Sequence, residues 1–199
     1  MKVKVFVEGG GDDNEDTITR CRQGFRAYCA KVAGEKSHPR IVPCGGRDQA
    51  FKKFKNEIKV NKTVERCVLL VDSEGPVGSK NPVAYLSKRD QWSFPPLDNH
   101  EVFLMVQAME AWFLADRDML SAYYGDGFLA GKLPGSPTSI EAVLKDDLER
   151  SLRHASKPTT KGEYHKTKHG FKLLALIDPA KVENASPHAK QFNDFLRGL

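Results

Sequence analysis

Apolar residues recur along the first half of the chain in two alternating patterns. Short runs rich in Val, Leu and Phe predict strands at residues 2–7, 66–71 and 101–106, with a weaker strand at 40–44 that contains Pro43. Apolar residues at helical spacing predict helices over 17–33, where Gly34 is a C-cap, and around 50–58, with a short helix near 82–88. Strands separated by helix-length segments are typical of βαβ units. The pattern therefore predicts an α/β fold whose mainly parallel sheet is flanked by helices.

The second half of the chain has a helical pattern. Residues 110–124 predict one helix or two, and a loop rich in Gly and Pro follows. Thr138 and Glu141 have the T-x-x-E form of a capping box, so we expect a helix from there to about Arg153. Ser186-Pro187 is typical of the start of a last helix. We expect residues 1–107 to form the α/β core and residues 108–199 to form helical additions packed on it, within a single structural domain.

The composition is that of a soluble globular protein, with 199 residues of which 40% are hydrophobic and 29% charged. No apolar run approaches the roughly 18 residues that a membrane helix requires. The start, MKVKVFVEGG, lacks the apolar stretch of a secretory signal because Lys2 and Lys4 interrupt it. These features predict a cytoplasmic protein without a membrane segment.

The cysteines carry no sign of disulfide or metal chemistry. Cys21, Cys29, Cys44 and Cys67 contain no CxxC pair and no spacing of a metal finger. Cys67 lies in a predicted strand, and Cys21 and Cys29 fit the buried side of a predicted helix. We expect all four to be reduced thiols of the core.

Carboxylates follow two of the predicted strands. The strand at 66–71 runs into Asp72 and Glu74 in the sequence LLVDSEGP, and Glu8 follows the first strand. Asp, Ser, Gly and Pro also favour turns, so a plain turn is the alternative. Because sites in open α/β sheets form at the carboxyl ends of strands, we expect the three carboxylates to converge. Such a cluster needs a cation, and hard oxygen ligands favour Mg²⁺ or Mn²⁺.

A glycine-rich turn follows Glu8. Without side chains, Gly10 and Gly11 allow their backbone N–H groups to approach an anion closely, so we expect them to contact a phosphate. A cation held by carboxylates beside a phosphate-sized pocket is typical of phosphodiester chemistry.

Glu110 follows the predicted strand at 101–106 and is a further candidate metal ligand. The alternative is a solvated acid in the first turn of a helix. Trp112 and Phe113 are expected in the core. Asp116 is expected to be a helix cap or a surface acid.

Basic residues dominate the segment from Arg150 to Lys172, which contains seven Lys or Arg and one acid, Glu163. We expect this segment to bind the phosphates of a nucleic acid through Lys157, Lys161, Lys166 and Lys168. The alternative is a mobile, solvated loop. Its histidines lack the spacing of a zinc site. A second basic surface, at Lys52, Lys53, Lys55, Lys59 and Lys62, is better explained as the solvent face of a helix.

The acidic pattern resembles the Toprim domain, which topoisomerases, DnaG-type primases, OLD-family nucleases and small RNA-maturation nucleases share. That family has a Glu on its first strand and an Asp-x-Asp pair on a later one, which bind Mg²⁺. Glu8 matches the glutamate and Asp72 the first aspartate, whereas Glu74 stands in place of the second aspartate. VFVEGGGD, LLVDSEGP, QAMEAWFLAD and LALIDP…SPHAKQF extend the resemblance to a family of small prokaryotic Toprim-like proteins, domain of unknown function 4276. This resemblance implies a Toprim-like fold and a nucleic-acid role.

Together these features predict a metal-dependent, nuclease-like protein that acts on a phosphodiester of nucleic acid. Glu8 would be a metal ligand or general base, Asp72 and Glu74 metal ligands, and Lys161 or Lys166 would stabilise charge in the transition state. The alternative is a non-catalytic module that binds nucleic acid or a nucleotide within a larger defence or repair system, together with a protein partner. A phosphatase of the haloacid-dehalogenase type is set aside because it needs paired aspartates on the first strand.

Overall fold

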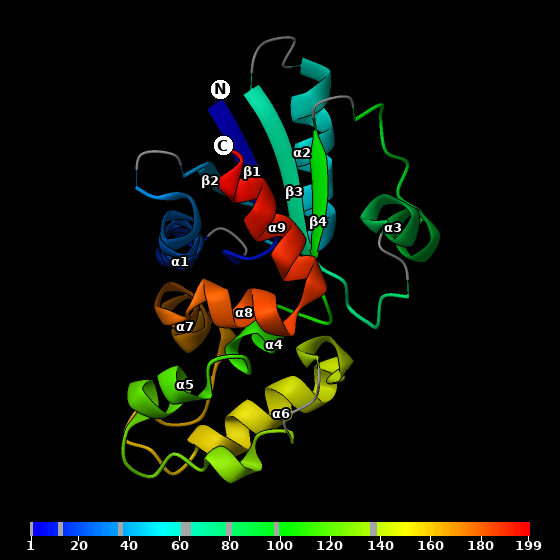
Figure 1. The fold of residues 1–199 in the computed structure, drawn as a ribbon. Coiled ribbons are helices and arrows are strands. Elements are labelled where there is room, and N and C mark those ends of the chain that lie inside the picture. Colours follow the sequence, from blue (N-terminus) through cyan, green and yellow to red (C-terminus); the bar gives the residue numbers. More distant parts are fainter. Residues whose placement is uncertain are drawn as a thin grey trace.

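The computed structural model describes residues 2–11, 14–35, 38–60, 65–78, 81–97, 100–135 and 139–199. These residues form one four-stranded sheet with helices on both faces (Figure 1). Its strands are β1 (Lys2–Val7), β2 (Arg40–Pro43), β3 (Glu65–Asp72) and β4 (Glu101–Met105). Every pairing is parallel, and the strand order is β2-β1-β3-β4. The predicted α/β fold is thus confirmed, and the strand that contains Pro43 lies at an edge.

The helices follow the alternation expected in the first half and then accumulate in the second. The α-helices are α1 (Glu15–Ala33), α2 (Arg47–Val60), α3 (Pro82–Asp90), α4 (Glu110–Phe113), α5 (Arg117–Tyr124), α6 (Lys145–Ser156), α7 (Phe171–Leu176), α8 (Pro179–Ala185) and α9 (Pro187–Arg197). Two 3₁₀ turns, η1 (Ala130–Lys132) and η2 (Ile140–Ala142), precede α6, and a π-helical turn, η3 (Lys166–Gly170), precedes α7. None of the described helices is long and apolar enough to cross a membrane.

Both faces of the sheet are buried, which explains why its strands read as continuous apolar runs. On β3, Val68 and Leu70 belong to a core shared with α1, α7 and α9, while Cys67, Leu69 and Val71 belong to a second core. That second core contains residues of α2 and α3. All four cysteines are buried free thiols, as predicted.

The helices of the C-terminal half gather beyond the carboxyl ends of the strands, and α9 returns along the sheet (Figure 1). On α9, Phe192 and Phe195 pack against Phe103 of β4 with ring centroids 5.4 and 5.3 Å apart. These helices therefore share a core with the sheet. The exact boundary at residue 107 stays a prediction.

The register of the strands positions the acidic residues. Val7, at the end of β1, lies opposite Leu70 of β3, and the N–H of Glu8 donates to the carbonyl of Leu70 at 3.2 Å. Asp72 ends β3, opposite Met105 of β4. Because the strands are parallel and end at similar levels, residues that follow β1, β3 and β4 meet at one edge of the sheet.

The helix predicted from the T-x-x-E pattern is placed wrongly. Thr138 lies outside the described residues, Ser139 caps only the 3₁₀ turn η2, and α6 begins later, at Lys145. The carboxylate of Glu141 accepts hydrogen bonds from the Ser186 hydroxyl and from the His188 N–H. Glu141 thus binds residues at the start of α9 instead of forming the predicted capping box. Ser186 itself caps α9 and is followed by Pro187, as predicted.

We predict that Gly24→Ala destabilises the protein. An added Cβ at Gly24 of α1 would lie 2.6 Å from the backbone carbonyl oxygen of Phe171, so α1 and α7 would have to separate. The expected loss is roughly 1–3 kcal/mol in the free energy of unfolding, measured by urea denaturation.

Gly131→Ala is the control, because nothing lies within 4 Å of an added Cβ there. Its stability should change by less than about 0.5 kcal/mol. A Gly24→Ala variant as stable as the wild type would contradict the close packing of α1 on α7.

Candidate metal centre at the carboxyl edge of the sheet

The segments that leave β3 and β4 are held together by hydrogen bonds. The Ser73 N–H donates to Met105 at 2.9 Å, and the Glu74 N–H donates to Gln107 at 3.0 Å. In return, the Gln107 N–H donates to the Ser73 hydroxyl at 2.8 Å. Glu74 and Gln107 both adopt positive φ angles, 62° and 63°, which non-glycine residues rarely adopt. Such backbone is maintained only where surrounding contacts hold it, and it is common at functional sites.

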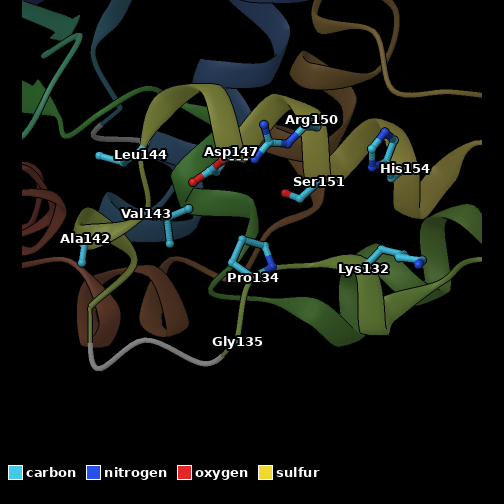
Figure 2. Close-up of a pocket in the computed structure, with 10 residues that line it drawn as sticks. All are labelled: Lys132, Pro134, Gly135, Ala142, Val143, Leu144, Asp147, Arg150, Ser151 and His154. Atoms are coloured by element: carbon cyan, nitrogen blue, oxygen red, sulfur yellow. Dashed lines mark hydrogen bonds and ion pairs between the residues drawn. The ribbon is translucent and has the colours of Figure 1, made fainter.

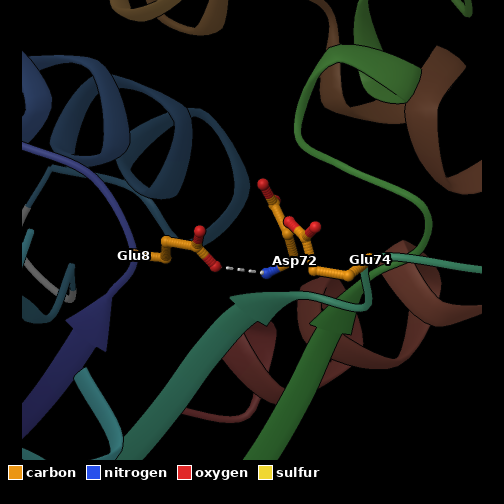
Figure 3. A group of neighbouring side chains, drawn as sticks. All are labelled: Glu8, Asp72 and Glu74. Atoms are coloured by element: carbon orange, nitrogen blue, oxygen red, sulfur yellow. Dashed lines mark hydrogen bonds between the residues drawn. The ribbon is translucent and has the colours of Figure 1, made fainter. Parts of the chain in front are cut away.

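Three carboxylates meet where β1 and β3 end (Figure 3). One oxygen each from Glu8, Asp72 and Glu74 lies within 4.8 Å of the others. Among the described residues, this is the one grouping of His, Cys, Asp or Glu side chains compact enough to hold a metal ion. The predicted convergence of these residues is therefore present, and a plain turn after β3 does not account for it.

Glu8 is partly buried and faces other acids. Its Oε2 accepts a hydrogen bond from the Asp72 N–H at 3.2 Å (Figure 3). Burial raises the pKa of Glu8 from its usual 4.5 to about 7, and the charge of Asp72 adds to this rise. Lys166 and Arg47 act in the opposite direction but do not cancel it.

Asp72 is the most enclosed of the three, with 1% of its side chain exposed. Its Oδ1 accepts the N–H of Met109 at 2.8 Å, which ties the end of β3 to the start of α4. Its Oδ2 accepts from the Lys166 ammonium group at 3.3 Å. Each oxygen therefore has a donor of its own.

Glu74 forms an ion pair with Lys145, the first residue of α6. Burial alone would raise the pKa of Glu74, but the hydrogen bond and the charge of Lys145 outweigh it, so the pKa is lowered. Glu74 is therefore ionised at neutral pH.

Glu110 is buried in the first turn of α4, beside the three carboxylates. Its Oε1 accepts from the Tyr164 hydroxyl at 2.8 Å, and its Oε2 lies 3.7 Å from the Lys166 ammonium group. Burial raises the pKa of Glu110, and Lys166 opposes this effect. A solvated helix-end acid is excluded by this burial, whereas the predicted role as a metal ligand stays a prediction. Trp112 and Phe113 are core residues, as predicted.

Asp116 caps α5 by accepting a hydrogen bond from the N–H of Met119, so of its two predicted roles the helix cap is confirmed. It is buried rather than on the surface, because it also accepts hydrogen bonds from the Asp178 N–H and from Lys181. These contacts place it in the packing of α5 against α8, away from the acidic cluster.

Arg47, at the start of α2, is a site residue that the sequence analysis missed. One guanidinium nitrogen donates to the backbone carbonyl of Asp72 at 2.6 Å, and another to Asp90 at 2.7 Å. Its guanidinium carbon lies 5.2 Å from the ring centre of Trp92. Lys145 was missed in the same way. The sequence indicates neither role, because Arg47 and Lys145 are charged residues at the start of a helix, and each lies far in sequence from the acid that it contacts.

The glycine turn after β1 is shaped by close contacts. The N–H of Gly9 donates to Gly45 at 2.7 Å, and Gly10 and Gly11 have positive φ angles of 99° and 65°. A Cβ at Gly10 would lie 2.9 Å from the side chain of Pro43. A hollow of about 350 Å³ opens beside Gly11, and Gln49 and Lys53 are among its lining residues. The N–H groups of Gly10 and Gly11 bond to no backbone carbonyl in the described part of the chain.

The side chains of the basic segment have different surroundings. Arg150 and Arg153 form ion pairs with Asp147 and Glu149, and the ammonium of Lys161 lies 5.3 Å from the ring centre of Tyr123. Lys157 and Lys168 are exposed. In the described chain, Lys166 is the member of the segment whose side chain contacts the acidic cluster. Lys62 of the second basic surface lies outside the described residues.

A separate hollow of about 420 Å³ runs along α6 (Figure 2). Basic, acidic and apolar side chains line it, including Lys132, Leu144, Asp147, Arg150 and His154. It shares no lining residue with the acidic cluster. We therefore assign the candidate chemistry to the sheet edge rather than to this hollow.

The residues at the sheet edge fit a hard divalent cation. Carboxylate oxygens are the ligands that Mg²⁺ and Mn²⁺ prefer. Two oxygens that share Mg²⁺ at about 2.0–2.1 Å lie at most about 4.2 Å apart, so only small side-chain rotations would be needed. The lysines neutralise only part of the negative charge of the cluster.

We predict that Glu8→Gln stabilises the protein in the presence of chelator at about pH 8. The folded protein holds the Glu8 proton more tightly than the unfolded chain, so ionising Glu8 removes stability as the pH rises from about 4.5 to about 7. Gln carries no charge and avoids this loss. We expect a gain of roughly 1–3 kcal/mol at about pH 8 and almost none at about pH 4, measured by chemical denaturation.

Glu74→Gln serves as the control with the opposite sign. It removes the partner of Lys145, so it should lower stability at neutral pH, where Glu74 is ionised. Equal effects of Glu8→Gln at both pH values would contradict the raised pKa of Glu8.

Comparison with known proteins places the chain in a family. The model of a domain of unknown function, DUF4276, matches residues 7–197. No curated protein and no solved structure matches the chain. The matched region runs from the end of β1 through α9 and includes all four carboxylates of the sheet edge. The chain therefore belongs to the DUF4276 family.

Proposed function

We propose that the protein is a metal-dependent, Toprim-like nuclease that cleaves a phosphodiester of nucleic acid with Mg²⁺ or Mn²⁺. The observation that carries the proposal is the meeting of Glu8, Asp72 and Glu74 within 4.8 Å at the carboxyl ends of adjacent parallel strands. The order of these acids along the chain resembles the Toprim pattern described above, apart from Glu74 in place of the second aspartate. That likeness supports the choice of phosphodiester chemistry among the reactions open to a carboxylate-bound cation.

The side chains of the site have separable roles in this proposal. Glu8, Asp72 and Glu74 would hold the ion, which when bound polarises a phosphoryl oxygen and lowers the pKa of a water molecule. In the alternative role, Glu8 would be a general base rather than a ligand, because a pKa of about 7 in the absence of an ion allows it to accept a proton near neutral pH. The Lys166 ammonium group, charged and partly exposed, would stabilise negative charge that develops on the phosphate.

Substrate binding would use groups on either side of the acids. In the part of the chain that the structure describes, the N–H groups of Gly10 and Gly11 bond to no backbone carbonyl, so they suit a phosphate oxygen. Lys157, Lys161 and Lys168 are exposed on the segment that leads into and through η3, and we propose that they contact the backbone of the nucleic acid.

A second function, a non-catalytic module that binds nucleic acid or a nucleotide, is favoured by one observation. Lys145 and Lys166 already form ion pairs with Glu74, Asp72 and Glu110, so the cluster tolerates part of its charge without an ion. In that case a protein partner in a defence or repair system would supply any chemistry. Metal binding without cleavage of any substrate would favour this function.

We predict that Glu8→Gln and Asp72→Asn each reduce cleavage at least about 100-fold while nucleic-acid binding is largely kept. Both remove a metal-binding carboxylate, whereas the proposed phosphate contacts lie elsewhere. The measurement is a cleavage screen over DNA and RNA substrates with Mg²⁺, Mn²⁺ or chelator, paired with calorimetric titration of metal.

Asp126→Asn is the matched control, since Asp126 is an exposed acid in the loop after α5. It should leave cleavage and metal binding unchanged. A wild-type protein that binds no divalent cation would refute the metal-dependent proposal.

We predict that replacing Lys157, Lys161 and Lys168 together by Ala weakens nucleic-acid binding. Each lost phosphate contact should reduce the slope of log affinity against log salt by about 0.7–0.9. Affinity is measured by fluorescence anisotropy at several salt concentrations.

The matched control replaces Lys2, Lys52 and Lys59, which carry the same total charge and are exposed on β1 and α2. It should leave the salt slope close to that of the wild type. An equal change in slope for the two triple variants would assign the effect to net charge and return the 157–168 segment to a solvated loop.

A further inference from the structure

Lys166 occupies a fixed place between two carboxylates that come from different strand ends. It is the first residue of η3, and the neighbouring Tyr164 anchors the segment through its hydrogen bond to Glu110. The Lys166 ammonium group lies 3.3 Å from Asp72 Oδ2 and 3.7 Å from Glu110 Oε2. The ammonium group therefore bridges the end of β3 and the start of α4.

Glu110 depends on Lys166 for compensation of its charge. The Glu110 side chain is 6% exposed, and its Oε2 accepts no hydrogen bond from the described residues. A buried carboxylate oxygen without a donor is costly unless a positive charge faces it. Here the nearest such charge is the ammonium group of Lys166, at 3.7 Å.

A divalent cation could not bind Asp72 and Glu110 together while Lys166 stays in place. An ion shared by these two carboxylates would lie about 2.0–2.1 Å from an oxygen of each, in the space that the ammonium group now fills. Two positive charges in that space would also repel each other strongly, because the surroundings are mostly buried.

The charges of the cluster agree with a single ion. Glu8, Asp72, Glu74 and Glu110 contribute four negative charges when ionised, and Lys145 and Lys166 contribute two positive ones. Arg47 forms its ion pair with Asp90, which Arg89 also contacts, so this group is not included in the count. The remaining excess of two negative charges is what one divalent cation neutralises.

We propose that Lys166 is a built-in second cation, so that the site holds one divalent ion at Glu8, Asp72 and Glu74 and excludes another between Asp72 and Glu110. The role of Glu110 in the wild type is then to hold Lys166 rather than to bind metal. This inference rests on the proposed metal-binding function and goes beyond it by fixing the number of ions and the reason for that number.

The test counts Mn²⁺ ions bound to the whole protein, by titration calorimetry and by electron paramagnetic resonance. The wild type should bind one Mn²⁺ with the spectrum of an isolated ion. Lys166→Met removes the charge and keeps much of the side-chain volume, so it should bind two, with the spin coupling of a close pair. Lys166→Gln, which keeps a hydrogen-bond donor, should also bind two, and it decides the question if the Met variant does not fold.

Three further variants test whether the second ion binds at Glu110 and whether the effect is specific to Lys166. Adding Glu110→Gln to Lys166→Met should return the count to one, because the second ion loses a ligand. Glu110→Gln alone should leave the count at one. Lys172→Met, a matched loss of an exposed lysine on α7, should also leave it at one.

The outcomes separate this inference from the function on which it rests. Two ions in the wild type, or one ion in both Lys166 variants, would overturn the inference and leave the metal-dependent function intact. No Mn²⁺ bound by the wild type would instead overturn the proposed function itself.

Discussion

The constraint on which the site depends is the repulsion among carboxylates gathered at one edge of a buried parallel sheet. The register of β1 and β3 brings Glu8 next to Asp72, and β4 delivers Glu110 to the same edge. Each carboxylate is partly or wholly removed from water, so none can be screened by solvent alone. Positive charge must therefore come from the chain itself or from a bound ion, and the arrangement of the C-terminal half follows from this need.

The C-terminal half supplies those charges from two separate places. Lys145 begins α6 and pairs with Glu74, while Lys166 begins η3 and pairs with Asp72 and Glu110. Tyr164 and the packing of Phe171 against Gly24 hold the second of these segments on the sheet domain. The helical additions are thus part of the site, even though the carboxylates all lie at or near the ends of strands of the sheet. A shift of α7 relative to α1 would move Lys166 and change the charge balance at Asp72.

Sequence reasoning identified the strands, most helices and the four acids at the sheet edge, because these depend on local patterns. Short apolar runs and helical spacing indicate which residues are buried, and parallel connections bring Glu8 and Asp72 to one edge. The start of α6 was predicted wrongly because Glu141 bonds to residues at the start of α9, a contact distant in sequence. Arg47 and Lys145 were missed for the same reason. Lys166 was identified as a site residue, but as part of a phosphate-binding segment, since nothing in its neighbourhood in sequence indicates a carboxylate partner.

The positive φ angles at Glu74 and Gln107 explain how the edge stays in place against this repulsion. A relaxed backbone at either position would turn the segment differently after the strand, and the exchange of hydrogen bonds between Ser73 and Gln107 prevents this. Asp72 is held in addition by the N–H of Met109, so its carboxylate cannot rotate away from Glu8 without losing a buried hydrogen bond. The backbone therefore fixes the acids close together, and Lys145 and Lys166 pair with them in that geometry. Because the carboxylates have little freedom to adapt to a second ion, the number of ions that the site can hold depends on the space that Lys166 leaves.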